Sequence, residues 1–323
     1  MRESVALRAV ILGLACLACG PPDAAVEGGD APVAGRAEAA PAAAPEYPRV
    51  EELADGVYAY EQLHRVGDET ITTISLFVVT PEGVLVADGQ ESVEETQRLV
   101  GAIAEVTDQP IRHVVIASDH GDHSAGNSAF PSDAVFYGHP TSAATLEAQA
   151  ASPNRPADAS PVVLPTRLVE DELALDLGGR EIRILHLGRA HTGGDLVVHV
   201  PLGDVLFMSE TYLDRVFPAM RSAYPSEWVA MVGAAQALEA DVYVPGHGIV
   251  GSPSVVSGDL ETYRRAMWTV IDVATNLHHA GVSIEEATER ADFGEIDGWA
   301  LAAGQRPRAI GRVYMELNGE LPQ

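Results

Sequence analysis

One ten-residue stretch of the sequence concentrates side chains that bind metal ions. It runs from Ser118 to Asn127 and reads S-D-H-G-D-H-S-A-G-N, so His120, Asp122 and His123 lie within four residues. Imidazole nitrogens and carboxylate oxygens are ligands that zinc takes in proteins. The small residues around them indicate a loop. This stretch therefore predicts a metal-dependent enzyme.

Four other short motifs can converge on the same site from distant parts of the chain. They read V-L-V-A-D-G at 84–89, G-R-A-H-T-G-G-D at 188–195, M-S-E-T at 208–211 and P-G-H-G at 245–248. Each contains or directly follows the end of a predicted strand, where loops commonly carry functional side chains. They contribute the candidates Asp88, His191, Glu210 and His247.

The composition narrows the range of partners. The chain has 323 residues and a net charge of −27, a surface that repels nucleic acid and anionic lipid headgroups. All 20 basic residues are arginine. Schiff-base lysine chemistry is thereby excluded, and any group that binds an anion must be arginine, backbone or metal. We expect a small-molecule substrate and no nucleic acid partner.

The first nineteen residues resemble an export signal. Arg2 and Arg8 precede an apolar run over 9–18 that is too short to span a bilayer. The run ends in a sequence similar to a bacterial lipoprotein cleavage site, in which Cys19 becomes the lipidated residue. Ordinary signal cleavage is the alternative. We expect an exported, periplasmic protein that contacts the membrane only through a lipid anchor.

The rest of the chain divides into two parts. Residues 20–46 are rich in Ala, Pro, Gly and acidic side chains and predict a disordered tether. Residues 47–323 predict a single domain that includes the C-terminal helices. Both cysteines, Cys16 and Cys19, precede this domain, so it has neither a disulfide nor a cysteine ligand.

Strands and helices alternate in two blocks along this domain. Apolar and β-branched runs predict strands at 56–60, 71–80, 84–87, 111–117, 134–138, 173–177, 181–187, 196–200, 205–208 and 242–244. Helical spacing predicts helices at 92–106, 141–150, 228–238, 259–280, 283–291 and 307–317, with Ser92 as an N-cap. This order indicates an α/β fold of four layers, with two sheets packed together and helices outside.

The five motifs together resemble the metallo-β-lactamase superfamily of metal-dependent hydrolases, over about residues 47–280. That family has His-x-His-x-Asp-His, a His in a Gly-His-Thr-like loop, a bridging Asp after a strand and a His in Pro-Gly-His-Gly. The resemblance implies a four-layer αββα sandwich of two mixed sheets with helices outside. It also implies two adjacent zinc positions, with iron as the alternative metal, and a supporting role for Asp88. The implied metal ligands are His120, Asp122, His123, His191, Glu210 and His247.

Two residues depart from the family pattern. Ser118 occupies the place of the first His, and Glu210 replaces the bridging Asp with a side chain one methylene longer. The first of the two implied metal positions (position one) therefore keeps His120 and His191. The second (position two) keeps Asp122, His123, His247 and Glu210. A serine hydroxyl is a poor zinc ligand beside imidazole. We expect position two to fill first and position one to bind weakly.

The resemblance also implies a reaction. Zinc lowers the pKa of bound water from 15.7 to about 7, which gives a hydroxide able to attack an acyl or phosphoryl centre at neutral pH. Asp122 is the expected catalytic residue, which orients the nucleophile and passes a proton to the leaving group. We expect hydrolysis of a small ester, lactone or amide. A non-catalytic metal-binding lipoprotein and an iron-dependent oxidoreductase are the alternatives.

A few further residues are candidates for the substrate pocket. His139 follows a predicted strand, and Tyr212 lies in the segment after Glu210. Arg215 and Arg221 in the same segment are candidates for binding a substrate carboxylate. We expect structural roles for the isolated histidines His64, His113, His186 and His199.

Overall fold

The computed structural model describes residues 46–251 and 260–322. All of them belong to the second of two units in the chain, Ala44–Gln323. The predicted signal, most of the predicted tether and the candidate lipidation site Cys19 lie outside the described residues. Within 46–251 and 260–322, no helix combines the length and the apolar character needed to cross a bilayer.

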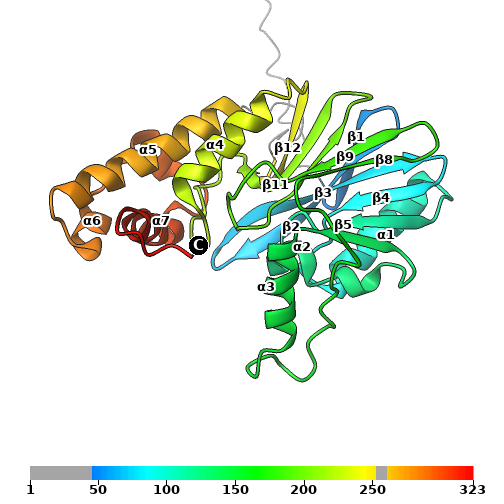
Figure 1. Cartoon of the computed structure of the whole chain (residues 1–323), viewed down its shortest axis with the longest axis horizontal. Coiled ribbons are helices and arrows are strands. Elements are labelled where there is room, and N and C mark those ends of the chain that lie inside the picture. Colours follow the sequence, from blue (N-terminus) through cyan, green and yellow to red (C-terminus); the bar gives the residue numbers. More distant parts are fainter. Residues whose placement is uncertain (1–45, 252–259, 323) are drawn as a thin grey trace, which may run out of the picture. The chain divides into compact units, whose positions relative to one another are not determined.

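The elements fall into two blocks (Figure 1). The first block contains β1 (Arg49–Ala54), β2 (Val57–Val66), β3 (Glu69–Thr80), β4 (Gly83–Ala87), α1 (Val93–Val106), β5 (Ile111–Val115), α2 (Gly121–Ser124), β6 (Val135–Gly138), α3 (Pro140–Ala150) and β7 (Arg167–Leu168). The second contains β8 (Glu172–Asp176), β9 (Glu181–Leu185), β10 (Val197–Val200), β11 (Val205–Leu213), α4 (Pro225–Gln236), β12 (Val242–Ile249), α5 (Leu260–His279), α6 (Ile284–Arg290) and α7 (Ala302–Leu317). Each predicted strand and helix is present among the described residues, with boundaries that differ by up to about six residues, whereas β1, β7 and α2 were not predicted.

The strands of both blocks form one continuous hydrogen-bonded sheet. Its order is β7-β6-β5-β4-β3-β12-β11-β10-β9-β8, with β2 and β1 paired onto β3. Parallel and antiparallel pairs both occur, so the sheet is mixed. The two blocks join where β3 runs antiparallel to β12, through the pairs His247↔Thr73, Gly248↔Thr72 and Ile249↔Ile71.

Three apolar clusters define four layers. One cluster draws on strands of both blocks, including Leu76, Val115, Val198 and Phe207, and therefore fills the space between the two halves of the sheet. A second cluster packs α1 and α3 against the first half. The third packs α4, α5 and α7 against the second half. In Figure 1, α4, α5, α6 and α7 lie together on one side, and α1 lies by β4 and β5. The predicted four-layer α/β fold is thereby confirmed, but the two predicted sheets are joined into one through the pairing of β3 with β12.

Helix α1 illustrates how local sequence signals set an element. Its N-cap is Ser92, whose Oγ accepts a hydrogen bond from the backbone N–H of Glu95 at 3.1 Å. Glu94 and Glu95 place negative charge in the first turn, where the helix dipole favours it. Leu99 and Ile103, one turn apart, face the core. Ser92 is thus confirmed as an N-cap.

Strands β11 and β12 extend further than the sequence predicts. Each continues through the junction of the two halves, to Leu213 and Ile249, and Leu213 pairs with His247. Glu210 and His247 consequently lie within paired strands instead of in loops beyond them. Their backbone positions are fixed by the sheet.

Gly246 is required where β12 passes β11. A Cβ at this position would lie 2.4 Å from the backbone carbonyl carbon of Ser209. We expect Gly246→Ala to lower the free energy of unfolding by about 1–3 kcal/mol, because neither strand can move aside without overpacking the core. Urea unfolding with excess chelator would measure this without a contribution from bound metal.

Gly101→Ala in α1 is the matched control. A Cβ there meets no atom within 4 Å. Alanine is the better helix former, so this change should raise stability by about 1 kcal/mol. A Gly246→Ala protein as stable as the unchanged chain would contradict the close approach of the two strands.

Candidate metal centre

The loop after β5 and the single turn of α2 present three of the predicted ligands. His120 is the N-cap of α2, and Asp122 and His123 lie within it. Ser124 fixes this turn, because its Oγ donates to the carbonyl of His120 at 2.8 Å. His123 is fully buried, whereas His120 and Asp122 remain partly open to solvent. The tight turn explains how residues so close in sequence face one centre.

Six predicted ligand residues form two groups that share Glu210. His120, His191 and Glu210 form ligand group one, which corresponds to position one. Asp122, His123, Glu210 and His247 form ligand group two, which corresponds to position two. Within each group the candidate ligand atoms lie within 4.8 Å of one another. The structure thus brings together all six residues that the sequence predicts as ligands.

The distances in group two suit a zinc ion. His247 Nε2 lies 3.2 Å from His123 Nε2, 3.2 Å from Asp122 Oδ2 and 3.3 Å from Glu210 Oε1. Zinc bonds of about 2.0–2.1 Å in a tetrahedral arrangement place neighbouring ligand atoms about 3.4 Å apart. The nitrogen and carboxylate donors are also of the type that zinc takes. Group two therefore fits the ion that the family resemblance implies.

Group one is tighter and centred on the other oxygen of Glu210. Glu210 Oε2 lies 2.6 Å from His120 Nδ1 and 3.0 Å from His191 Nε2, and these two nitrogens are 3.0 Å apart. Since Oε1 faces group two, the carboxylate connects both groups, as the bridging aspartate of the family pattern would. Group one has three donors and group two has four.

Ser118 contacts this same carboxylate. Its buried Oγ donates a hydrogen bond to Glu210 Oε2 at 3.0 Å. The short serine side chain thus leaves room that the longer glutamate fills. The two departures from the family pattern are in direct contact, and the serine hydroxyl positions the carboxylate that bridges the two groups.

Buried hydrogen bonds orient the histidine rings of group two. His247 Nδ1 donates to the carbonyl of Thr72 at 2.8 Å, which leaves Nε2 facing the group. His123 Nδ1 lies 3.1 Å from Asp88 Oδ2, so its Nε2 also faces inward. Asp88 is fully buried and accepts from the N–H of Ala117 at 2.8 Å and from Ser209 Oγ. Partners of this kind fix the tautomer of a metal-binding histidine.

The loop that carries His191 is held by residues that sequence reasoning did not single out. The buried Asp195 accepts from the Thr192 backbone N–H at 2.6 Å and from Thr192 Oγ1 at 2.8 Å. The ring of Trp228 packs edge-on to the His191 ring at 5.1 Å. The Gly-Gly-Asp sequence that ends this motif is the signal from which such a turn could have been predicted.

The carboxylates and imidazoles shift one another's ionisation strongly. Burial alone would raise the pKa of Glu210, but His191 and His120 outweigh it and hold that pKa well below its usual range. Burial lowers the pKa of His120, but Glu210 outweighs it and raises the pKa to about 9. For His247, Asp122 and Glu210 outweigh burial and raise the pKa to about 10. A metal ion competes with these protons, so its affinity increases with pH.

A cavity of about 190 Å³ opens onto both ligand groups. Among its lining residues are five of the six predicted ligands, all except His123, together with Arg221, which the sequence analysis proposed as an anion-binding candidate. Sequence reasoning missed His64, Gln305 and Arg308. His64 was expected to be structural, but it lines this cavity, with Nε2 3.7 Å from Asp122 Oδ2 and Nδ1 2.8 Å from Glu91.

Other predicted pocket residues lie elsewhere. Tyr212 does not line the cavity; its side chain is fully buried in the helix-side cluster, where it packs against Tyr263. His139 caps α3 and stacks on His186 at 4.1 Å, beside the loop that carries His191. Arg215 lines a separate cavity. These positions depend on how distant helices and strands pack against one another, and the sequence alone does not show that packing.

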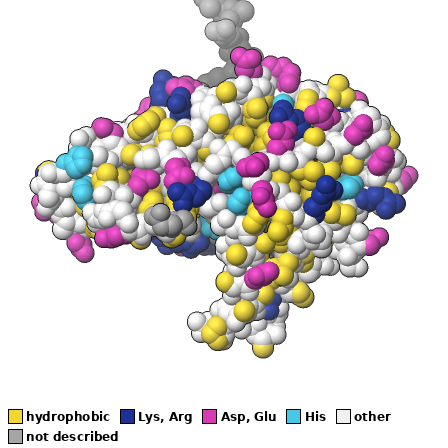
Figure 2. Space-filling view, in the orientation of Figure 1, with side chains coloured by type: hydrophobic (Ala, Val, Ile, Leu, Met, Phe, Trp, Pro, Cys, Tyr) yellow, Lys and Arg dark blue, Asp and Glu magenta, His cyan; other side chains and the backbone are white. Residues whose placement is uncertain are grey.

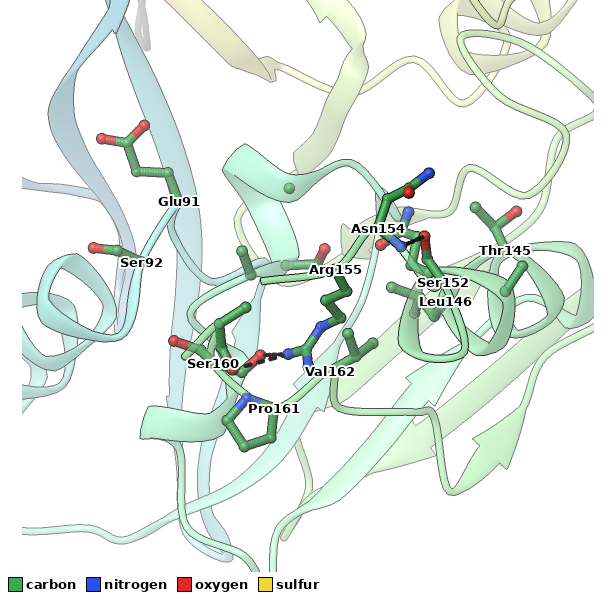
Figure 3. A pocket seen from close by; sticks show the side chains of 16 residues that line it. Glu91, Ser92, Thr145, Leu146, Ser152, Asn154, Arg155, Ser160, Pro161 and Val162 are labelled. Carbon is green, nitrogen blue, oxygen red and sulfur yellow. Dashed lines mark hydrogen bonds between the residues drawn. The ribbon is translucent and has the colours of Figure 1, made fainter. Parts of the chain in front are cut away.

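A larger cavity of about 730 Å³ lies beside α2 and α3 (Figure 3). Its lining is largely apolar and includes Leu146, Pro161 and Val162, and Glu91 lies at one end. Arg155 is bound within it, because its guanidinium donates to the carbonyls of Ala159 and Ser160. None of the predicted metal ligands is among its lining residues.

Metal content tests the assignment of the two groups. Because group two has four donors and group one three, we expect dialysed protein to keep about one tightly bound zinc per chain. Asp122→Ala should lose it, and His191→Ala should keep it. The exposed Asp133→Ala is the matched control and should also keep it. Elemental analysis that finds two tight zinc ions, or loss of the ion in His191→Ala, would contradict this order of filling.

Two curated relatives match much of this chain. The linear primary-alkylsulfatase of Pseudomonas sp. (strain ATCC 19151) is 23% identical over 257 residues, which cover 66% of this chain and 48% of that protein. The 2,4-dinitroanisole O-demethylase subunit alpha of Nocardioides sp. (strain JS1661) is 22% identical over 188 residues, covering 57% and 54%. The chain therefore spans about half the length of these relatives.

Solved structures and a family model agree with the fold. A metallo-beta-lactamase from Pontibacter korlensis superposes with a TM-score of 0.56 at 21% identity, covering 67% of this chain and 98% of that one. Residues 67–247 match the family model described as the Metallo-beta-lactamase superfamily. That range is more than half of the chain and includes all six predicted ligands. The protein belongs to the metallo-beta-lactamase superfamily.

Proposed function

We propose that this protein is a metal-dependent hydrolase that cleaves a small ester, lactone or amide, with zinc as its metal and iron as the alternative. The observation that carries the proposal is the cavity of about 190 Å³, which opens onto both ligand groups. When bound to such groups, a zinc ion supplies Lewis acidity and makes water nucleophilic at neutral pH. A purely structural metal site would be closed, whereas a catalytic site keeps an open position.

Asp122 is suited to move a proton at this site. Its side chain is 23% exposed, so it meets the cavity while its Oδ2 lies 3.2 Å from His247 Nε2. His247 and His123 hold the pKa of Asp122 below its usual range, against the opposing effects of burial and Glu210. The carboxylate is therefore ionised at neutral pH, and it can orient a water molecule. His64 Nε2, 3.7 Å away, offers a path for the proton toward the leaving group.

The size and lining of the cavity favour a small substrate. About 190 Å³ is less than the roughly 300–1,000 Å³ of sites that hold drug-sized ligands. The two curated relatives are named for alkylsulfatase and O-demethylase activities, which both concern groups linked through oxygen. These names support our proposal of an ester as the first of the three substrate classes. A β-lactam is the amide that the fold's solved relatives suggest.

Ester hydrolysis tests the proposal. Zinc-loaded protein should hydrolyse p-nitrophenyl acetate, lose the activity on treatment with chelator and regain it when zinc is added. Asp122→Ala should lower kcat/KM by about 100-fold or more, because the change removes a zinc ligand as well as a positioned acid or base. The exposed Asp133→Ala serves as control. A zinc-loaded protein no faster than Asp122→Ala would instead support the non-catalytic, metal-binding alternative.

We also propose that the protein is exported and anchored through lipid on Cys19. The support is the basic and apolar order of residues 1–19. In a bacterial host, the full chain should fractionate with membranes, and Cys19→Ala should release it to the soluble periplasmic fraction. Equal membrane association of both proteins would contradict the anchor.

A further inference from the structure

Two arginines line the cavity that faces the ligand groups. Arg221 lies in the segment before α4, and Arg308 lies on α7, so they reach the cavity from separate elements. Both are exposed. Among the described residues, four arginine side chains make no ion pair or hydrogen bond: Arg112, Arg215, Arg221 and Arg308. Two of these four therefore lie in one small cavity.

This absence of partners is unusual in so acidic a chain. The sequence has 47 acidic residues and 20 arginines, and Figure 2 shows Asp and Glu spread over the visible face with arginines between them. Arginines elsewhere pair with acids, as Arg189 does with Glu227 and Arg306 with Asp297. Arg221 and Arg308 line the same cavity, so an anion bound there can be attracted by both positive charges.

The remainder of the cavity lining is suited to an apolar body. Carbon side chains line much of it, from Val66, Ile71, Leu213, Val216, Ala219 and Leu301. Gln305, one turn before Arg308 on α7, adds an amide to the same lining. Guanidinium groups match a carboxylate well because their planar N–H donors can bind both of its oxygens. The lining thus combines anion-binding donors, apolar walls and the ligand groups.

We infer that Arg221 and Arg308 bind a carboxylate carried by the substrate, so that the enzyme prefers small esters with an apolar body and a second, non-reacting acidic group. This inference rests on the proposed hydrolase function. In the reaction, water adds its hydroxyl to the acyl carbon and its proton to the leaving oxygen, while the ester C–O bond breaks. The bound carboxylate is unchanged and serves only to place the ester beside Asp122.

Two esters with one leaving group test the preference. Mono-p-nitrophenyl succinate carries a carboxylate, and p-nitrophenyl butyrate of similar length does not. The unchanged protein should favour the succinate in kcat/KM. Arg221→Gln and Arg308→Gln should each reduce that preference about tenfold, mainly through KM, since a charge-assisted hydrogen bond is lost. Arg112→Gln, which removes an exposed, unpaired arginine elsewhere, should retain it.

Binding without turnover separates this inference from the proposed function. Calorimetry on the zinc-loaded full chain should show pentanoate binding more tightly than pentanamide, with the difference lost in Arg221→Gln and Arg308→Gln. If pentanoate binding survives both changes and disappears in Asp122→Ala, the carboxylate sits at the ligand groups and the inference is overturned. Hydrolysis of both esters at equal rates would overturn it while leaving the hydrolase function intact. Arginine-dependent pentanoate binding without hydrolysis would support the anion site and reject the hydrolase function.

Discussion

Four side chains meet at the carboxylate of Glu210. Ser118, His120 and His191 contact one oxygen at 2.6–3.0 Å, and His247 lies 3.3 Å from the other. Burying this charge is costly unless partners surround it, so the histidines and the hydroxyl are what allow the carboxylate to remain ionised there. Both ligand groups depend on this one side chain. Any change that moves Glu210 alters both groups at once.

The junction between the two halves of the sheet fixes the position of Glu210. Strand β11 carries Glu210, β12 carries His247, and β3 pairs with β12 beside them. Gly246 permits the close approach of β12 to the backbone at Ser209, the residue before Glu210. Asp88 then connects the first half of the sheet to this point, through Ser209 Oγ and His123. Its backbone has a φ of 63°, a strained conformation of the kind found at functional sites.

The sequence was sufficient to predict which residues form the two ligand groups, because each lies in a short motif in a strand or near its end. Its two anomalies, at Ser118 and Glu210, were also visible, but their contact was not, because 92 positions separate them. The pocket was harder to predict. His64, Gln305 and Arg308 reach it from β2 and α7, and no local pattern distinguishes them from surface or core residues. Tyr212 is the opposite case. It was predicted to line the pocket because it follows Glu210 closely, but its side chain packs wholly into the core.

The candidate metal ligands and the two cavity arginines come from different parts of the fold. This difference suggests how chemistry and substrate selectivity are divided between residues. The ligands come from the sheet and the loops that it holds, where the core constrains every position. Arg221 and Arg308 come from a connecting segment and from α7, which packs outside the sheet. Substitutions there change what enters the cavity without moving Glu210. Under the proposed function, one metal-binding framework serves different substrates, and residues of α7 and of the segment before α4 determine which acidic ester binds.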